Sequence, residues 1–129
     1  MSDQNPEKSV AVIGASNDRS KFGNMAVRAY RSEGWQVYPV NLREAQVEGL
    51  PAYASIAAID APVTRALIYL QPQLVAAELE AIAQKGVREI YFNPGTESPE
   101  AIAKASALGR DTRIECSIVA IGRSPSDPD

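Results

Sequence analysis

The sequence of 129 residues contains no histidine. A Ser-His-Asp or Cys-His catalytic site is therefore excluded, and so is a metal site built on histidine. General acid–base chemistry would fall to carboxylates, lysines or tyrosines, and no motif concentrates these groups. We expect neither catalytic residues nor metal ligands, and the composition argues against catalysis by this chain alone.

Signals for export, membrane insertion or nucleic-acid binding are also missing. A single cysteine excludes an internal disulfide, which is consistent with a reducing compartment. No apolar stretch approaches the roughly 18 residues of a membrane span, and residues 1–8 carry no signal-peptide core. The net charge is −3 and there is no long basic run. We therefore expect a cytoplasmic protein without a membrane or nucleic-acid partner.

The residues that are present fit an ordinary soluble globular protein, with 45% hydrophobic and 22% charged residues. A chain of this length has room for one domain with one core. We expect the domain to span residues 9–122, between flexible tails at 1–8 and 123–129.

The stretch from Val10 to Gly23 has the pattern of a buried strand, a tight turn and the start of a helix. The apolar run Val10–Ile13 is typical of a strand buried on both faces, and Gly14 permits a tight turn after it. A helix begins near residue 23, so its N-terminal N–H groups can bind an anion. Ser16, Arg19 and Lys21 would add a hydroxyl and two cations to that site. A plain strand-to-helix connection would have the same turn, so both interpretations stay open.

This turn differs from two common nucleotide motifs. No Gly-Lys-Ser/Thr follows at the spacing of a P-loop, and the three close glycines of a dinucleotide site are absent. The second predicted strand ends at Asn41, with Arg43 close behind, where NAD-binding proteins have a carboxylate. An amide and a guanidinium suit a phosphorylated ribose better, so NAD is disfavoured.

The rest of the chain alternates strand and helix patterns, which predicts an α/β fold with a parallel sheet. The predicted strands are 9–14, 35–40, 65–70, 87–92 and 113–116. The predicted helices are 23–33, 72–85 and 98–109, with a short turn at 55–59, a polar connection at 42–54 and an apolar closing segment at 117–122. In such a sheet the ligand binds beyond the carboxyl ends of the strands. That rule gathers residues 14–21, 41–43, 70–72, 93–96 and 116–117 at one edge.

Several short motifs occur in these segments, in register along residues 9–121. They are Val12-Ile13-Gly14-Ala15-Ser16, Lys21-Phe22-Gly23, Val37-Tyr38-Pro39-Val40-Asn41, Asn93-Pro94-Gly95-Thr96 and Glu115-Cys116-Ser117. Together they resemble the stand-alone CoA-binding proteins related to the CoA-binding domain of the succinyl-CoA synthetase α subunit. The resemblance implies a Rossmann-like three-layer α/β/α fold with a mostly parallel five-stranded sheet, and CoA or acyl-CoA as the cofactor.

The resemblance also assigns roles to individual residues. Pyrophosphate would contact Gly14, Ala15 and Ser16. Phosphate charge would be neutralised by Lys21 and Arg19, and the adenosine 3′-phosphate would lie towards Asn41 and Arg43. The groove for the nucleotide or pantetheine would be lined by Leu70, Gln71 and Pro72, and the pantetheine would be flanked by Asn93, Pro94 and Gly95, which also make a simple turn without any ligand. Cys116 would lie near the CoA thiol or serve as a small buried side chain.

Three functions follow from these patterns. The first is a non-catalytic CoA-binding carrier, sensor or partner subunit, because the larger synthetases need a phosphorylatable histidine that this chain lacks. The second is the binding subunit of an acyl-CoA ligase or transferase completed by another chain, for which a larger acyl-CoA synthetase-type protein is the candidate partner. The third is a module for NADP or another nucleotide.

Overall fold

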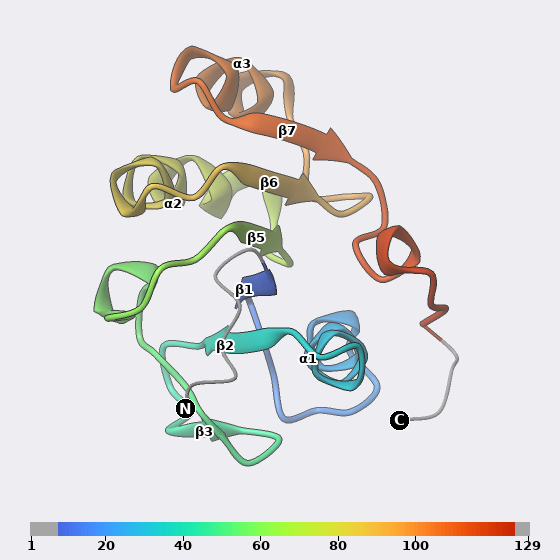
Figure 1. Ribbon diagram of the computed structural model, residues 1–129. Helices are drawn as coiled ribbons and strands as arrows, with labels where there is room; N and C mark the ends of the chain where they lie inside the picture. Colours follow the sequence, from blue (N-terminus) through green and yellow to red (C-terminus); the bar gives the residue numbers. More distant parts are fainter. Residues whose placement is uncertain (1–7, 126–129) are drawn as a thin grey trace.

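The computed structural model describes residues 8–125, which form an α/β domain around a five-stranded parallel sheet with strand order β2-β1-β5-β6-β7 (Figure 1). The strands of this sheet are β1 Ser9–Ile13, β2 Gln36–Val40, β5 Arg65–Ile68, β6 Glu89–Phe92 and β7 Asp111–Ile114. The helices are α1 Phe22–Ser32, α2 Pro72–Lys85 and α3 Pro99–Ala107, with 3-10 turns η2 Ile56–Ala58 and η3 Val119–Ile121. The expected α/β fold with a parallel sheet is confirmed.

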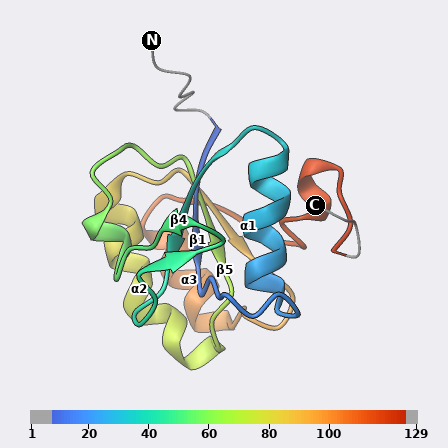
Figure 2. The same ribbon diagram turned by 90° about the horizontal axis from the view of Figure 1, so that it is seen from below.

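The sheet is the middle one of three layers. Helices α2 and α3 cover one face, and α1 and the C-terminal turn η3 cover the other (Figure 2). Alternation along β1 divides its side chains between the two cores, with Ala11 and Ile13 facing α2 and Val10 and Val12 facing α1. Every residue of β1 is buried, as expected for the central strand of a parallel sheet.

The helix boundaries follow the predicted local signals. Ser98 is the N-cap of α3, and its Oγ accepts a hydrogen bond from the Ala101 amide at 3.1 Å. Pro72 and Pro99 occupy the first turns of α2 and α3, where a missing N–H costs nothing. Gly86 ends α2 with φ +84°, the left-handed conformation that glycine adopts freely.

Two predicted strands are shortened, since β5 ends at Ile68 and not at residue 70, and β6 begins at Glu89 and not at residue 87. Two further segments differ more in kind. The connection at 42–54 contains an antiparallel hairpin, β3 Gln46–Val47 with β4 Leu50–Pro51, and each of its strands is too short to show a period. The last strand, β7, lies at 111–114 and not at 113–116, because the Asp111 amide already donates to the Arg88 carbonyl at 2.8 Å. Most of β7 is exposed, so it lacks the apolar pattern that would have located it.

Strand register brings the carboxyl ends of the sheet level with one another. Ile13 pairs with Val40 on one side and with Ile68 on the other, and Ile68 in turn pairs with Phe92. The chain moves outward from β1 to β2 on one side, while β5 lies on its other side. This reversal of strand order produces a crevice beyond the ends of β1 and β5.

The terminal segments are only partly described. Residues 1–7 of the expected N-terminal tail and residues 126–129 of the expected C-terminal tail lie outside the described range. Arg123, which is described, donates a hydrogen bond to the Glu33 carboxylate at 3.0 Å, next to the end of α1. None of the helices within residues 8–125 is long and apolar enough to cross a membrane.

Candidate functional site

A groove of about 820 Å³ lies beyond the carboxyl ends of the strands. It is lined by the β1–α1 connection and the segments that follow β2, β5, β6 and β7. All predicted site residues line this groove except Arg19 and Arg43: they are Gly14, Ala15, Ser16, Lys21, Asn41, Leu70, Gln71, Pro72, Asn93, Pro94, Gly95 and Cys116. The crevice expected at the point of strand reversal is therefore present.

Two glycines let backbone segments approach one another at the base of the groove. Gly14 has φ +96°, and a Cβ built on it would lie 2.4 Å from the Tyr69 carbonyl oxygen. A Cβ on Gly23 would lie 2.5 Å from the Gly14 carbonyl oxygen. Real side chains do not fit at such distances, so the first turn of α1 sits directly against the turn that follows β1. This packing brings the N-terminus of α1 to the groove.

Side-chain amides set the orientation of the loop backbone. The Asn41 Nδ2 donates to the Ala15 carbonyl at 2.7 Å, and the Asn24 Nδ2 donates to the Ser16 carbonyl at 2.8 Å. A trans peptide places the next N–H on the side opposite the carbonyl. These two bonds therefore fix the directions of the Ser16 and Asn17 N–H groups. Asn41 supports the loop in addition to lining the groove.

The cations near the loop are placed differently from one another. Lys21 is exposed, lines the groove and makes no ion pair with any described residue. Arg19 lies outside the groove, with its Nε 3.2 Å from the Glu48 carboxylate. Arg43 also lies outside, and its amide donates to the Asn41 Oδ1 at 2.7 Å. Within the described part of the chain, Lys21 is the cation in contact with the groove.

Asn93 joins the ends of three segments beneath the groove. Its Nδ2 donates to the Ile68 carbonyl at 3.0 Å, and its Oδ1 accepts from the Ser117 amide at 2.9 Å and from the Ser117 Oγ at 3.0 Å. The Tyr69 hydroxyl shares a 2.8 Å hydrogen bond with the same Oγ. Burial raises the pKa of Tyr69, and its hydrogen bond to Ser117 lowers the pKa only in part. Tyr69 is therefore a neutral phenol near neutral pH, and Cys116 lies half-buried next to this network.

Several groove residues were not predicted as site residues: Ser20, Phe22, Gly23, Tyr69 and Thr96. Phe22 and Gly23 belong to the Lys21-Phe22-Gly23 motif, and Thr96 follows Gly95 directly, so the motifs contained a signal for these three. Tyr69 was assigned to the third strand, and its place at the groove follows from β5 ending at Ile68. The side chain of Phe22 is large and 58% exposed, so it offers an apolar surface for a ligand.

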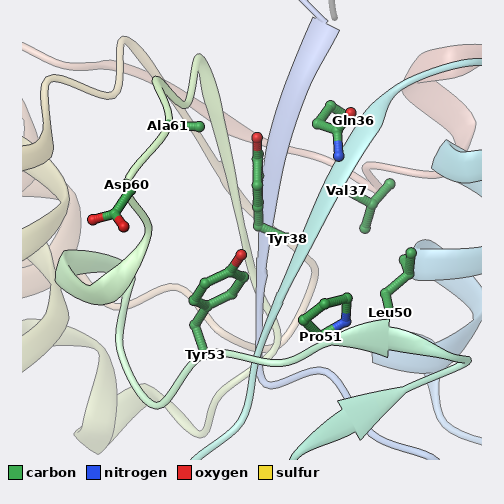
Figure 3. A pocket seen from close by; sticks show the side chains of 8 residues that line it. All are labelled: Gln36, Val37, Tyr38, Leu50, Pro51, Tyr53, Asp60 and Ala61. Atoms are coloured by element: carbon green, nitrogen blue, oxygen red, sulfur yellow. The ribbon is translucent and has the colours of Figure 1, made fainter.

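A second hollow of about 300 Å³ lies beside β2, away from the groove (Figure 3). Tyr38 and Tyr53 meet there edge to face, with ring centroids 5.9 Å apart. Asp60 supplies a carboxylate, and no lysine or arginine lines the hollow. It therefore lacks the groups that bind phosphate, and the groove is the candidate site.

The sequence profile of the CoA binding domain family matches residues 8–121. The chain belongs to this family. The resemblance drawn from the sequence motifs is thereby confirmed, and the family accounts for the whole sheet and the groove.

Two curated relatives of this CoA binding domain are much longer proteins. The α subunit of ADP-forming acetate–CoA ligase II from Pyrococcus furiosus is 39% identical over 86 residues, which cover 66% of this chain and 19% of the relative. The ADP-forming acetate–CoA ligase I from Archaeoglobus fulgidus is 36% identical over 80 residues, covering 62% and 12%. The chain thus spans less than a fifth of the length of either relative.

Solved structures share the fold, both in a chain of similar length and in a much longer chain. A conserved hypothetical protein from Pyrococcus furiosus has a TM-score of 0.82 and 26% identity, covering 88% of this chain and 98% of its own. The dinucleotide-forming acetyl-coenzyme A synthetase 1 of Korarchaeum cryptofilum, in complex with phosphate and ADP, has a TM-score of 0.75 and 25% identity, covering 84% and 25%. The CoA binding domain fold therefore occurs both alone and as part of a larger chain.

Proposed function

We propose that this chain binds CoA or an acyl-CoA in the groove at the carboxyl ends of the strands. The observation that carries the proposal is the β1–α1 loop, where Gly14 and Gly23 pack backbone against backbone and Asn41 and Asn24 hold the carbonyls. A loop fixed in this way presents N–H donors to a pyrophosphate without reorganising. Lys21, exposed and free of ion pairs within residues 8–125, neutralises phosphate charge.

The remaining groove residues suit the pantetheine arm and the nucleotide. Leu70 and Pro72, which follow β5, and Pro94 and Gly95, which follow β6, add apolar surface to the groove. Cys116 stands at the same edge, where a CoA thiol would end. Asn41 and Arg43 remain the residues assigned to the adenosine 3′-phosphate, with Arg43 reaching it from outside the groove.

We assign the chain a binding role without chemistry of its own. It has no histidine to carry a phosphoryl group, and among the described residues that line its groove there is no carboxylate to act as a base. It would act as a carrier, as a sensor or as a partner of a larger acyl-CoA synthetase-type protein. The partner role is supported by the relatives, because the Pyrococcus furiosus ligase is named as an α subunit.

A nucleotide such as NADP is the second candidate, favoured by Asn41 and Arg43 after β2. Its support is weaker, because it rests on these two residues, whereas the CoA binding domain family matches residues 8–121. The Asn41 amide is engaged with the Ala15 carbonyl and with the Arg43 and Glu44 amides, which limits its contact with a ribose phosphate of either ligand. Arg43 would have to bind a ribose phosphate from outside the groove.

Thermal unfolding with matched ligands separates the two candidates. A ligand that binds only the native state stabilises it by about 2.7 kcal/mol at a concentration of 100 times Kd. We expect CoA and acetyl-CoA to raise Tm more than NADP or NAD at equal concentration. Equal or greater stabilisation by NADP would reject CoA as the ligand. Dephospho-CoA, which lacks the 3′-phosphate, tests the role of Arg43. The native chain should bind dephospho-CoA less tightly than CoA, whereas Arg43→Ala should bind the two ligands with equal affinity.

A further inference from the structure

The β3–β4 hairpin packs against the loop that the proposed function assigns to pyrophosphate. Asn17 of the loop donates through Nδ2 to the Gln46 carbonyl at 2.7 Å, and its Oδ1 accepts from the Glu48 amide at 3.1 Å. Arg31 of α1 donates to the Glu48 carbonyl at 2.8 Å. The hairpin is thus hydrogen-bonded to both the loop and the helix, although no role was predicted for this segment.

Glu48 occupies this turn at a conformational cost. Its φ is +51°, and among the described residues it is the only one other than glycine with a positive φ. Gly49 follows with φ +79°, so both central residues of the two-residue turn are left-handed. Asparagine or glycine suits the first of these positions better than glutamate. A residue that persists in an unfavourable backbone conformation is a candidate for a specific role.

The Glu48 carboxylate connects the hairpin to the core of the site. Its side chain is 15% exposed, and its Oε2 accepts from the Asn24 Nδ2 at 3.0 Å and lies 3.2 Å from the Arg19 Nε. Asn24 is fully buried, and the same Nδ2 also donates to the Ser16 carbonyl at 2.8 Å. The Asn24 Oδ1 accepts from the Arg28 Nε at 2.7 Å. A carboxylate can only accept, so Glu48 adds to the Ser16 carbonyl and the Arg28 Nε in favouring the orientation in which the Asn24 amide directs its NH₂ towards the loop.

We propose that Glu48 is a positioning residue of the groove, which acts through Asn24 on the Ser16 carbonyl. By holding that carbonyl, the pair fixes the peptide that follows Ser16 and thus the donors of the loop. The inference rests on the proposed function, because those donors matter only if an anion binds there. The direction of the change in CoA affinity on removing Glu48 is diagnostic, since a carboxylate near an anion site would by itself weaken binding. Removing Glu48 should therefore weaken CoA binding if it positions the loop, and strengthen binding if it acts only as a charge.

The test compares Glu48→Gly and Glu48→Gln with Glu33→Gln as a control. Glycine suits the left-handed turn but removes the acceptor, so Glu48→Gly should keep a Tm close to that of the native chain and bind CoA about tenfold more weakly. Glutamine keeps one acceptor oxygen and should restore part of the affinity. Glu33→Gln removes the same charge beside Arg123, far from the groove, and should leave affinity unchanged. CoA affinity in Glu48→Gly equal to or above that of the native chain would overturn the proposal.

A second measurement needs no ligand. Both Asn24 Nδ2 protons are hydrogen-bonded in a buried site. In NMR these protons should exchange slowly with water in the native chain and rapidly in Glu48→Gly. Unchanged exchange would overturn the positioning role even if affinity fell. If the native chain fails to bind CoA in titration calorimetry, the proposed function fails, and this exchange still shows whether Glu48 orders the loop.

Discussion

The two ends of the sheet hold their cations in opposite ways. At the amino end, Arg65 lies between two rings, with its Cζ 4.7 Å from the Trp35 centroid and 4.6 Å from the Tyr91 centroid. Its Nε donates to the Glu89 carboxylate at 2.8 Å, and its Nη1 donates to the Tyr30 hydroxyl at 3.2 Å. The side chain is only 13% exposed.

At the carboxyl end, Lys21 is exposed in the groove and has no ion pair among residues 8–125. The charge of Arg65 is already satisfied within the fold, whereas the charge of Lys21 is available to a ligand. Arg65 therefore stabilises the native state, whereas Lys21 is the cation that we propose for ligand binding, and each can be removed without the other.

Removing Arg65 should have the largest effect on stability. Arg65→Ala leaves the Glu89 carboxylate without its partner, removes one of the two hydrogen bonds of the Tyr30 hydroxyl and removes the contact with both rings. We expect the free energy of unfolding to fall by about 3 kcal/mol. This is the lower end of the range for breaking a buried ion pair, because Glu89 is partly exposed. Urea denaturation measures this change, and CoA affinity should stay the same. A loss below about 1 kcal/mol would show that the stacked pair is no more than a surface contact.

Tyr30 makes the same cluster sensitive to alkaline pH. Burial raises its pKa from 10.0 to about 12, and the hydrogen bond from Arg65 opposes the shift. A raised folded-state pKa contributes stability that is complete below pH 10 and is lost as the pH rises from 10 to about 12. The contribution is about 2–3 kcal/mol. The difference in unfolding free energy between the native chain and Tyr30→Phe should therefore shrink over that interval, and a difference that is constant with pH would contradict the shift.

Lys21 should give the reverse of the Arg65 result. Lys21→Ala removes a charge-assisted contact, so CoA affinity should fall about tenfold to a hundredfold, or about 1.5–3 kcal/mol. Stability without ligand should change by less than about 0.5 kcal/mol, because an exposed loop lysine packs little. Titration calorimetry measures the affinity, and Lys104→Ala on α3 is the matched loss of one cation. Equal affinity in Lys21→Ala and the native chain would make Lys21 an ordinary surface charge.

The sequence predicted the elements whose signals are local. Val10–Ile13 is apolar throughout, Gly14 marks the turn, and Ser98 with Pro99 marks the start of α3. These signals also located most of the groove, because topology brings the carboxyl ends of parallel strands together.

Contacts between distant residues were not predictable in this way. Arg19 was expected at the phosphate, but it pairs with Glu48, which lies 29 positions later in a hairpin of two-residue strands. The stacking of Arg65 depends on rings at positions 35 and 91, which only the strand order brings together. Such pairs have no periodic signature, since they arise from the assembled sheet.

The Ser117 contacts have a consequence for the order in which the molecule forms. The Tyr30 hydroxyl donates to the Ser117 carbonyl at 2.7 Å across 87 positions, and Asn93 accepts from the same residue. During synthesis from the N-terminus, every residue of the sheet emerges before Ser117 does. Until then the Asn93 Oδ1 lacks the donors that hold it at the base of the groove. The donors that hold Asn93 at the base of the groove therefore come from a segment that follows every strand of the sheet in the sequence.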